Sequence, residues 1–504
     1  MQSIVKLCGD QIVPLITEQM SMNHASANLL LLSRAGFGPS AEDIRKLGIQ
    51  SPRITYRNLR KASSAQPEYF KVSSNMLDGL VKGIQDVGKM EQLSKEQRAQ
   101  IRKQSQQDLK SLNLRWIREM VNSPAQLREK MAFFWHGHFA CREINIYFQQ
   151  HLLDIIRRNA LGNFGELLRE VSKSASMLSF LNNQQNRKQQ PNENFAREVM
   201  ELFTMGRGNY TEQDIKEAAR AFTGWGFNLQ GEFVFRKNLH DEGVKTVLGR
   251  TGNLNGDDVL NILLEERQTA RYLAAKIYRF FVNEKADAAK VQWLAERFYK
   301  NKYDISVLLE DIFTSDWFYE DNNLGAKIKS PIELMVGIQR ILPMEFEQEE
   351  VQLLYQRLLG QVLFYPPNVA GWPGGENWID SSSLMYRLRL PRVLHDDDHF
   401  NAKPKDDDDV AMGERMESSQ KPLVKHSKAT AKGIMNVDIN WMAYVSQFAG
   451  VDKTNLPAAI ASSLLTVGQV NLDTIHAYTE KDSRENYIRS LTIGLMSLPE
   501  YQVS

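Results

Sequence analysis

The sequence predicts a mostly α-helical fold: a large multi-helix globular domain with one small β-hairpin near residues 226–236. Two observations predict it. Apolar residues recur at helical spacing through most of the chain, and a glycine or a capping residue stands where such runs end. Only the stretch 225–236 alternates instead, with aromatic residues on both sides of Gly231, which is the pattern of a hairpin.

Composition excludes several classes of protein. The 62 basic and 61 acidic residues almost cancel, so the chain has no overall basic excess for nucleic acid. Two cysteines, Cys8 and Cys141, are too few for a disulfide framework. No apolar run is long enough to span a membrane. Polar residues interrupt the apolar stretch 7–16, so no clear signal peptide is expected.

The composition also suggests how the chain is divided. Helical patterns fill residues 1–390, which we expect to form the core domain. Residues 391–434 contain runs of aspartate with lysine and serine, which indicates a disordered acidic insertion. Amphipathic helices return in 435–504, and we expect this segment to pack on the core.

Several helix ends are marked by capping signals. A helix is expected to end near Ala35, and Ser40 with Asp43 should cap the next one. Thr211 and Asp214 form a similar pair before an apolar stripe that Gly224 stops. We also expect one amphipathic helix over 195–203.

The stretch 129–140 places His136 and His138 among four aromatic residues. Ser123 and Gln126 predict a capped helix leading into it. In an unbroken helix the two imidazoles would point about 200° apart. We expect the helix to end at Gly137, because glycine adopts a left-handed C-cap easily, and both rings could then face one cavity.

This arrangement would suit a divalent transition metal such as zinc. Neutral histidines are common ligands, and His136 and His138 would form part of a set that His240 and Asp241, with Glu198 or Glu201, could complete. Bound metal would activate a water molecule for hydrolysis, and a glutamate could act as general base. The candidate catalytic residues are Glu198, Glu201, Arg197 and Asp241.

The alternative is purely structural. A histidine beside aromatic residues is often a packed ring whose nitrogens bond backbone groups. Arg197 and Glu201, together with Glu193, lie at four-residue steps and could form an ion-pair ladder between helices.

Tryptophans supply the candidate substrate-binding residues, Trp225, Trp372 and Trp378, because an aromatic face suits the C–H surface of a sugar ring. The loop 366–378 is rich in proline and glycine yet holds two tryptophans, so we also expect it to pack onto the body as a structural plug.

Several long motifs together resemble one family. They are the segments 28–38, 134–140, 191–206, 209–225 and 368–375, with the His240–Asp241 loop between them. The chain is similar, over nearly its whole length, to the bacterial family catalogued as domain of unknown function 1800.

The resemblance implies no established activity. It implies a neighbour that resembles alkaline phosphatases and sulfatases, and this neighbour is a candidate protein partner in the cell envelope. Relatives often look exported, whereas this chain shows no clear export signal, so the compartment stays open between periplasm, secretion and cytoplasm. Two functions are therefore considered: a metal-assisted hydrolase at His136 and His138, and a non-catalytic helical scaffold or binding partner.

Overall fold

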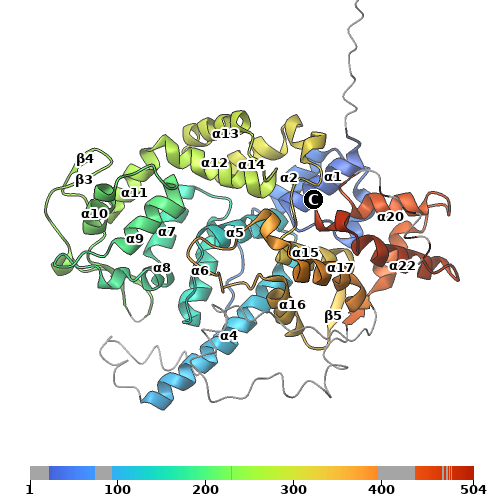
Figure 1. Ribbon diagram of the computed structural model, residues 1–504, viewed down its shortest axis with the longest axis horizontal. Helices are drawn as coiled ribbons and strands as arrows, with labels where there is room; N and C mark the ends of the chain where they lie inside the picture. The colour runs from blue at the N-terminus through green and yellow to red at the C-terminus, as the bar shows by residue number, and fades with distance from the viewer. Residues whose placement is uncertain are drawn as a thin grey trace, which may run out of the picture.

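The chain is mostly helical in the computed structural model, as the sequence predicts (Figure 1). The structure describes residues 22–73, 94–228, 230–395 and 437–504, apart from positions 468, 469, 471, 473, 474, 476 and 478. The expected acidic insertion lies outside the described residues from position 396 onward, and so does the stretch 7–16. Among the described residues, the strands form three two-stranded antiparallel sheets.

The first three helices begin at residues that the sequence marks. The side chain of Asn23 accepts a hydrogen bond from the amide of Ser26, and Ser40 and Asp43 form the expected capping box. The buried side chain of Asn28 donates to the backbone carbonyl of Leu47. The elements are α1 (His24–Ala35), the 3-10 helix η1 (Ala41–Lys46) and α2 (Pro52–Ala62).

A central helix, α5, is buried along almost its whole length. Its Glu129 is fully buried and accepts hydrogen bonds from Trp116 Nε1 and from Arg157 Nε, both at 3.0 Å. These bonds join α5 to the helices before and after it. Figure 1 shows α4 extending from this centre beyond the body. The three helices are α4 (Lys95–Asn122), α5 (Gln126–His138) and α6 (Ile146–Asn159).

The following segments form one end of the molecule (Figure 1). The expected hairpin is present, with Trp225 opposite Phe235 and Phe227 opposite Phe233. The capping box of Thr211 and Asp214 is also confirmed. The elements are α7 (Phe164–Lys173), α8 (Ala175–Phe180), η3 (Asn183–Gln185), α9 (Glu193–Glu198), η4 (Val199–Met205), α10 (Glu212–Ala221), β1 (Trp225–Phe227), β2 (Phe233–Phe235), η5 (Lys237–Leu239), β3 (Lys245–Val247), β4 (Arg250–Gly252) and α11 (Gly256–Glu265).

A long helix, α12, runs from this end back toward α1 and α2 (Figure 1). It packs against α13 on one side and against η4 on another. Its apolar residues, including Leu273, Ile277 and Phe281, are fully buried. The elements are α12 (Arg267–Phe281), α13 (Ala288–Lys300), α14 (Ile305–Phe313), η6 (Asp316–Tyr319) and η7 (Asp321–Asn323).

The other end of the molecule combines two segments that are far apart in sequence. Strand β5 pairs with β6, so that Met344 lies opposite Ile439, and α20 packs on α1. The elements are α15 (Pro331–Ile341), β5 (Met344–Phe346), α16 (Val351–Leu359), η8 (Gly375–Trp378), α17 (Ser381–His395), β6 (Val437–Ile439), α19 (Trp441–Val445), η10 (Ser446–Phe448), α20 (Leu456–Leu464), α22 (Arg484–Met496) and η11 (Pro499–Gln502).

Two hydrophobic cores result. The first is built around α5 and α12, and the second joins α15, α16 and α17 to the residues from 439 onward. Buried charges lie where the two cores meet. Glu333 forms ion pairs with both Lys130 (2.6 Å) and Lys327 (2.7 Å) there. None of the described helices is long and apolar enough to cross a membrane.

Candidate functional site

The helix that carries His136 and His138 does not end where the sequence analysis expects. α5 begins at Gln126 without a side-chain cap from Ser123, and it continues through Gly137 to His138. The expected break at Gly137 is therefore wrong. In a continuous helix, residues two positions apart point about 200° apart. The two imidazoles consequently lie on opposite sides of α5.

His136 is packed in a buried aromatic pocket. Its exposed fraction is 2%, and its ring lies against Trp116 and Trp372, with centroids 5.1 and 5.4 Å away. Its Nε2 accepts a hydrogen bond from the backbone N–H of Phe364 (3.2 Å). Burial lowers the pKa of His136 to about 3, so this imidazole is neutral.

His138 faces a different set of residues. Its Nε2 lies 3.1 Å from the carbonyl oxygen of Phe203, and its Nδ1 lies 2.9 Å from Nζ of Lys276. The ring therefore donates through Nε2 and accepts through Nδ1. Burial and the nearby Lys276 both hold the pKa of His138 well below its usual value, and burial also lowers the pKa of Lys276 to about 8.

His240 and Asp241 form a third, separate arrangement after the hairpin. The Nδ1 of His240 bonds the backbone carbonyl of Thr223 (2.9 Å). Asp241 accepts two hydrogen bonds from Arg220, at 2.7 and 3.2 Å, and one from the backbone N–H of Gly243. The hydrogen bond from Arg220 lowers the pKa of Asp241. This carboxylate therefore has a structural partner.

The expected single helix over 195–203 is two elements. The α-helix α9 ends at Glu198, and the chain continues as the π-helix η4. Side chains from other helices bond two carbonyl groups of this turn: Tyr272 Oη donates to Leu202, and His138 Nε2 donates to Phe203. A π-helical turn is a local insertion that periodicity does not reveal.

Arg197 and Glu201, two of the candidate catalytic residues, bond side chains of their own segment or of the start of α10, not the histidines. Arg197 pairs with Glu193 (3.1 Å) and Glu212 (2.6 Å), as the ladder alternative expects in part. Glu201 accepts a hydrogen bond from Tyr210 and lies 3.4 Å from Arg207. Burial raises the pKa of the half-buried Glu198, and the charge of Glu201 raises it further. In the part of the chain that the structure describes, none of these carboxylates forms a hydrogen bond or ion pair with His136 or His138.

The structure thus does not assemble the three histidines into one ligand set. His136, His138 and His240 each bond a different backbone segment. Over the described part of the chain, no group of three or more His, Cys, Asp or Glu side chains is placed to hold a metal ion.

The three candidate tryptophans also lie apart. Trp225 packs against Phe222 and Phe233 beside the hairpin. Trp372 lies against His136, whereas Trp378 is buried and its carbonyl accepts the hydroxyl of Ser383. Among the described residues, no ring contact joins any two of them.

The loop that carries Trp372 packs onto the body, as expected. A Cβ atom added to Gly371 would lie 2.4 Å from the carbonyl oxygen of Gly137, so the backbone of this loop lies directly on the end of α5. The φ of Gly371 is 84°, a left-handed conformation that favours glycine. The loop therefore closes His136 off from solvent.

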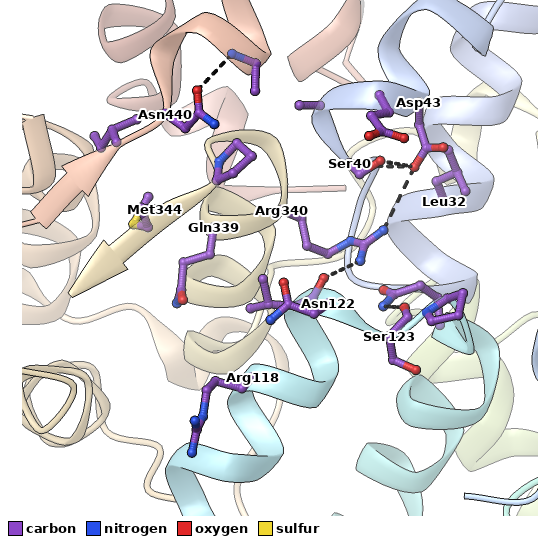
Figure 2. Close-up of a pocket in the computed structure, with 18 of the residues that line it drawn as sticks. Leu32, Ser40, Asp43, Arg118, Asn122, Ser123, Gln339, Arg340, Met344 and Asn440 are labelled. Atoms are coloured by element: carbon purple, nitrogen blue, oxygen red, sulfur yellow. Dashed lines mark hydrogen bonds and ion pairs between the residues drawn. The ribbon is translucent and has the colours of Figure 1, made fainter.

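A large groove lies elsewhere, where the N-terminal helices meet the C-terminal segment. Its volume is about 1610 Å³, and α1, η1, α2, the end of α4, α15, both strands β5 and β6, α19 and α22 contribute to its walls (Figure 2). Sequence reasoning missed this groove, because its walls come from segments hundreds of residues apart.

The floor of the groove is fixed by Arg340 of α15. Its guanidinium donates to the backbone carbonyl of Gly38 (2.9 Å). It also donates to the carbonyl of Val121 (2.7 Å) and lies 3.9 Å from the carboxylate of Asp43 (Figure 2). Burial lowers the pKa of Arg340 to about 10. This side chain holds three walls of the groove in place.

Further charged pairs lie along the groove. Arg118 pairs with Glu349 (3.7 Å), and Arg489 pairs with Glu485. The groove also presents apolar groups, of which Met442 on α19 is 80% exposed. The surface is therefore mixed, with apolar and polar side chains side by side.

Comparison with known proteins adds a family and no activity. The model of the family described as protein of unknown function (DUF1800) matches residues 30–503. No curated protein and no solved structure matches the chain.

Proposed function

This chain belongs to the DUF1800 family, and we propose that it is a non-catalytic helical scaffold that binds a protein partner in the groove beside α19. The observation that carries the proposal is the contrast between this groove and the surroundings of His136 and His138. The groove is large and open to a ligand, whereas His136 and His138 are buried and individually bonded.

The histidines support the proposal through their environment. A hydrolytic site needs space for substrate and water beside its reactive groups. His136 is closed off by Trp116, Phe364 and Trp372, and its Nε2 already accepts a hydrogen bond from the backbone. Such a ring stabilises the fold through packing rather than through chemistry.

The groove supports the proposal through its size and surface. Protein interfaces combine apolar anchor points with a polar rim. Met442 supplies an exposed apolar group, and methionine adapts to partners of irregular shape. The ion pairs of Arg118 and Arg489 line the same groove. The partner we propose is the phosphatase- or sulfatase-like protein that the family resemblance implies.

A substitution at Met442 tests this function. Binding of the purified phosphatase-like neighbour should be measured by calorimetry for the unaltered protein, for Met442→Asp, and for Trp293→Asp. Met442→Asp should weaken the affinity at least tenfold, about 1.4 kcal/mol, because it places a charge where an apolar anchor is buried.

Trp293 is the control, since it is 41% exposed on α13 and does not line the groove. Trp293→Asp should therefore leave binding unchanged. Equal binding by all three proteins, or no binding by any, would rule out this partner at this groove.

The metal-assisted hydrolase is a second candidate, and one observation favours it. The π-helix η4 lies against His138, and π-helical turns are frequent at functional sites. Metal content by mass spectrometry separates the two functions. The scaffold predicts no stoichiometric metal in the unaltered protein or in His136→Ala/His138→Ala. Near-stoichiometric metal that the double substitution removes, with the fold intact, would favour the hydrolase instead.

A further inference from the structure

The strand pair β5–β6 forms part of the wall of the groove and has an open edge. The sheet has only these two strands among the residues that the structure describes. In the described part of the chain, no backbone group outside the sheet bonds Met344 or Phe346, so the outer edge of β5 is free. An unpaired strand edge offers backbone N–H and C=O groups to another extended chain.

The hydrogen-bond register shows which backbone groups are free. The amide of Asn440 donates to the carbonyl of Pro343 (2.8 Å), and Glu345 lies opposite Asp438. Hydrogen-bonded pairs alternate along an antiparallel ladder. The backbone groups of Met344 and Phe346 therefore point away from β6, toward the open edge.

The same sheet carries an uncompensated negative charge. Glu345 and Asp438 are exposed, lie directly opposite each other and line the groove. Neither forms an ion pair with any residue in the described ranges. Like charges directly opposite destabilise a strand pair, so a cation placed beside them would be stabilised.

The rest of the groove does not cancel this charge. Asp43, Glu349 and Glu485 are already paired with arginines. Glu42 is a third carboxylate in the lining without an ion pair among the described residues, and Lys46 is the one such lysine in the lining. The residual charge of the groove is negative.

We propose that the groove binds an extended, basic segment of the partner protein, which adds to the edge of β5 and places a lysine or arginine beside Glu345 and Asp438. This inference rests on the proposed function. Neighbouring strands lie about 4.8 Å apart, so a basic side chain on the added strand lies directly beside Glu345, with Asp438 one strand further on. The adjacent apolar side chains of the segment would face Met344 and Phe346.

Peptides of alternating lysine and valine, about six residues long, test the mode of binding. Their binding to the full chain should be measured by fluorescence anisotropy, beside a glutamate–valine peptide of the same pattern. A third peptide is the lysine–valine sequence with alternate backbone nitrogens methylated. The first peptide should bind, and the acidic and methylated ones should bind at least tenfold more weakly.

Matched variants locate the charge. Glu345→Gln/Asp438→Asn should weaken binding of the lysine–valine peptide roughly fivefold to tenfold, and high salt should remove most of that difference. Glu376→Gln, at an exposed carboxylate outside the groove lining, should leave binding unchanged.

Three outcomes would overturn the inference. They are failure of the lysine–valine peptide to bind, equal binding of the methylated or acidic peptide, and equal binding by the double variant. If the full chain forms a dimer, and Glu345→Gln/Asp438→Asn abolishes that dimer, the groove would instead bind a second copy of this chain. None of these results changes the Met442→Asp measurement, so the proposed function would fail or stand separately.

Discussion

At the scale of single residues, Lys329 is a half-buried lysine that forms no ion pair with a carboxylate among the described residues. Its Nζ donates to the carbonyl of Tyr501 (2.7 Å) and lies 3.8 Å from the centroid of that ring. Burial lowers the pKa of Lys329 to about 7, and the neighbouring cations Lys130, Lys327 and Arg387 act in the same direction against Glu333. This side chain therefore opposes folding whenever it must be charged.

Stability should consequently rise with pH. An unfolded lysine keeps its proton up to its usual pKa near 10.5, whereas the folded Lys329 loses it above about 7. Between these values the unfolded state binds more protons, so the free energy of unfolding increases with pH. The penalty is fully present below pH 7 and is relieved as the pH rises. The contribution of one proton is at most about 1.4 kcal/mol per pH unit.

Urea unfolding between pH 7 and 9.5 measures this effect. Lys329→Met should flatten the increase and stabilise the protein at pH 7, because it removes the charge that burial disfavours. Lys300→Met, at an exposed lysine of α13, should leave the pH dependence unchanged. If the free energy of unfolding of Lys329→Met rises with pH as steeply as that of the unaltered protein, another group causes the pH dependence.

At the scale of elements, α5 decides the candidate site, because its passage through Gly137 separates His136 from His138. Two alanine substitutions test this conformation. A Cβ at Gly137 and a Cβ at Gly208 would each meet nothing within 4 Å, but only Gly208 has a positive φ, of 83°.

Gly137→Ala should raise the free energy of unfolding by about 0.5–1 kcal/mol, since alanine favours a helix over glycine. Gly208→Ala should lower it by about 1–2 kcal/mol, because a left-handed conformation strains alanine. Thermal unfolding of both variants gives the comparison. Destabilisation by Gly137→Ala would mean that the helix ends there and that the two imidazoles share a side.

Local signals explain how much of the fold the sequence could predict. The capping box of Ser40 and Asp43, the similar box of Thr211 and Asp214, and the hairpin depend on residues a few positions apart. Gly137 is compatible with both a helix and a helix end, so its neighbours alone could not decide. The π-helix η4 follows from side chains on α5 and α12 that bond its carbonyls.

The candidate site could not be predicted from the sequence, because it depends on contacts between residues that are far apart along the chain. His136 bonds Phe364, and Arg340 bonds Gly38, across more than two hundred residues of sequence. The residue types in 129–140 suit both a metal site and an aromatic core. Only the fold shows which groups form hydrogen bonds with the imidazole nitrogens.

At the scale of the whole molecule, the two cores are joined by buried side chains as well as by apolar contact. Arg34 of α1 is 1% exposed and donates to backbone carbonyls in three distant segments. These acceptors are Phe281 and Val282 at the end of α12, Asn323 after α14, and Ser504. One side chain thus ties the first core to the C-terminal segment.

The C-terminal residues are also held by a short backbone ladder. The amide of Lys327 donates to the carbonyl of Ser504, the amide of Ser504 donates back, and the amide of Lys329 donates to Gln502. Because Arg34 bonds the same carbonyl of Ser504, removing the guanidinium should loosen this ladder first. Arg34→Met leaves the acceptors unsatisfied at the junction, whereas the interior of each core keeps its packing.

Hydrogen exchange followed by mass spectrometry tests this local opening. In Arg34→Met, the amides of Lys327, Lys329 and Ser504 should exchange at least tenfold faster, while those of α5 change much less. Arg53→Met, at an arginine whose side chain is 69% exposed, should leave the pattern unchanged. Equal acceleration in α5 and in the ladder would instead show that the two cores unfold as one cooperative unit, and that Arg34 stabilises the whole of it.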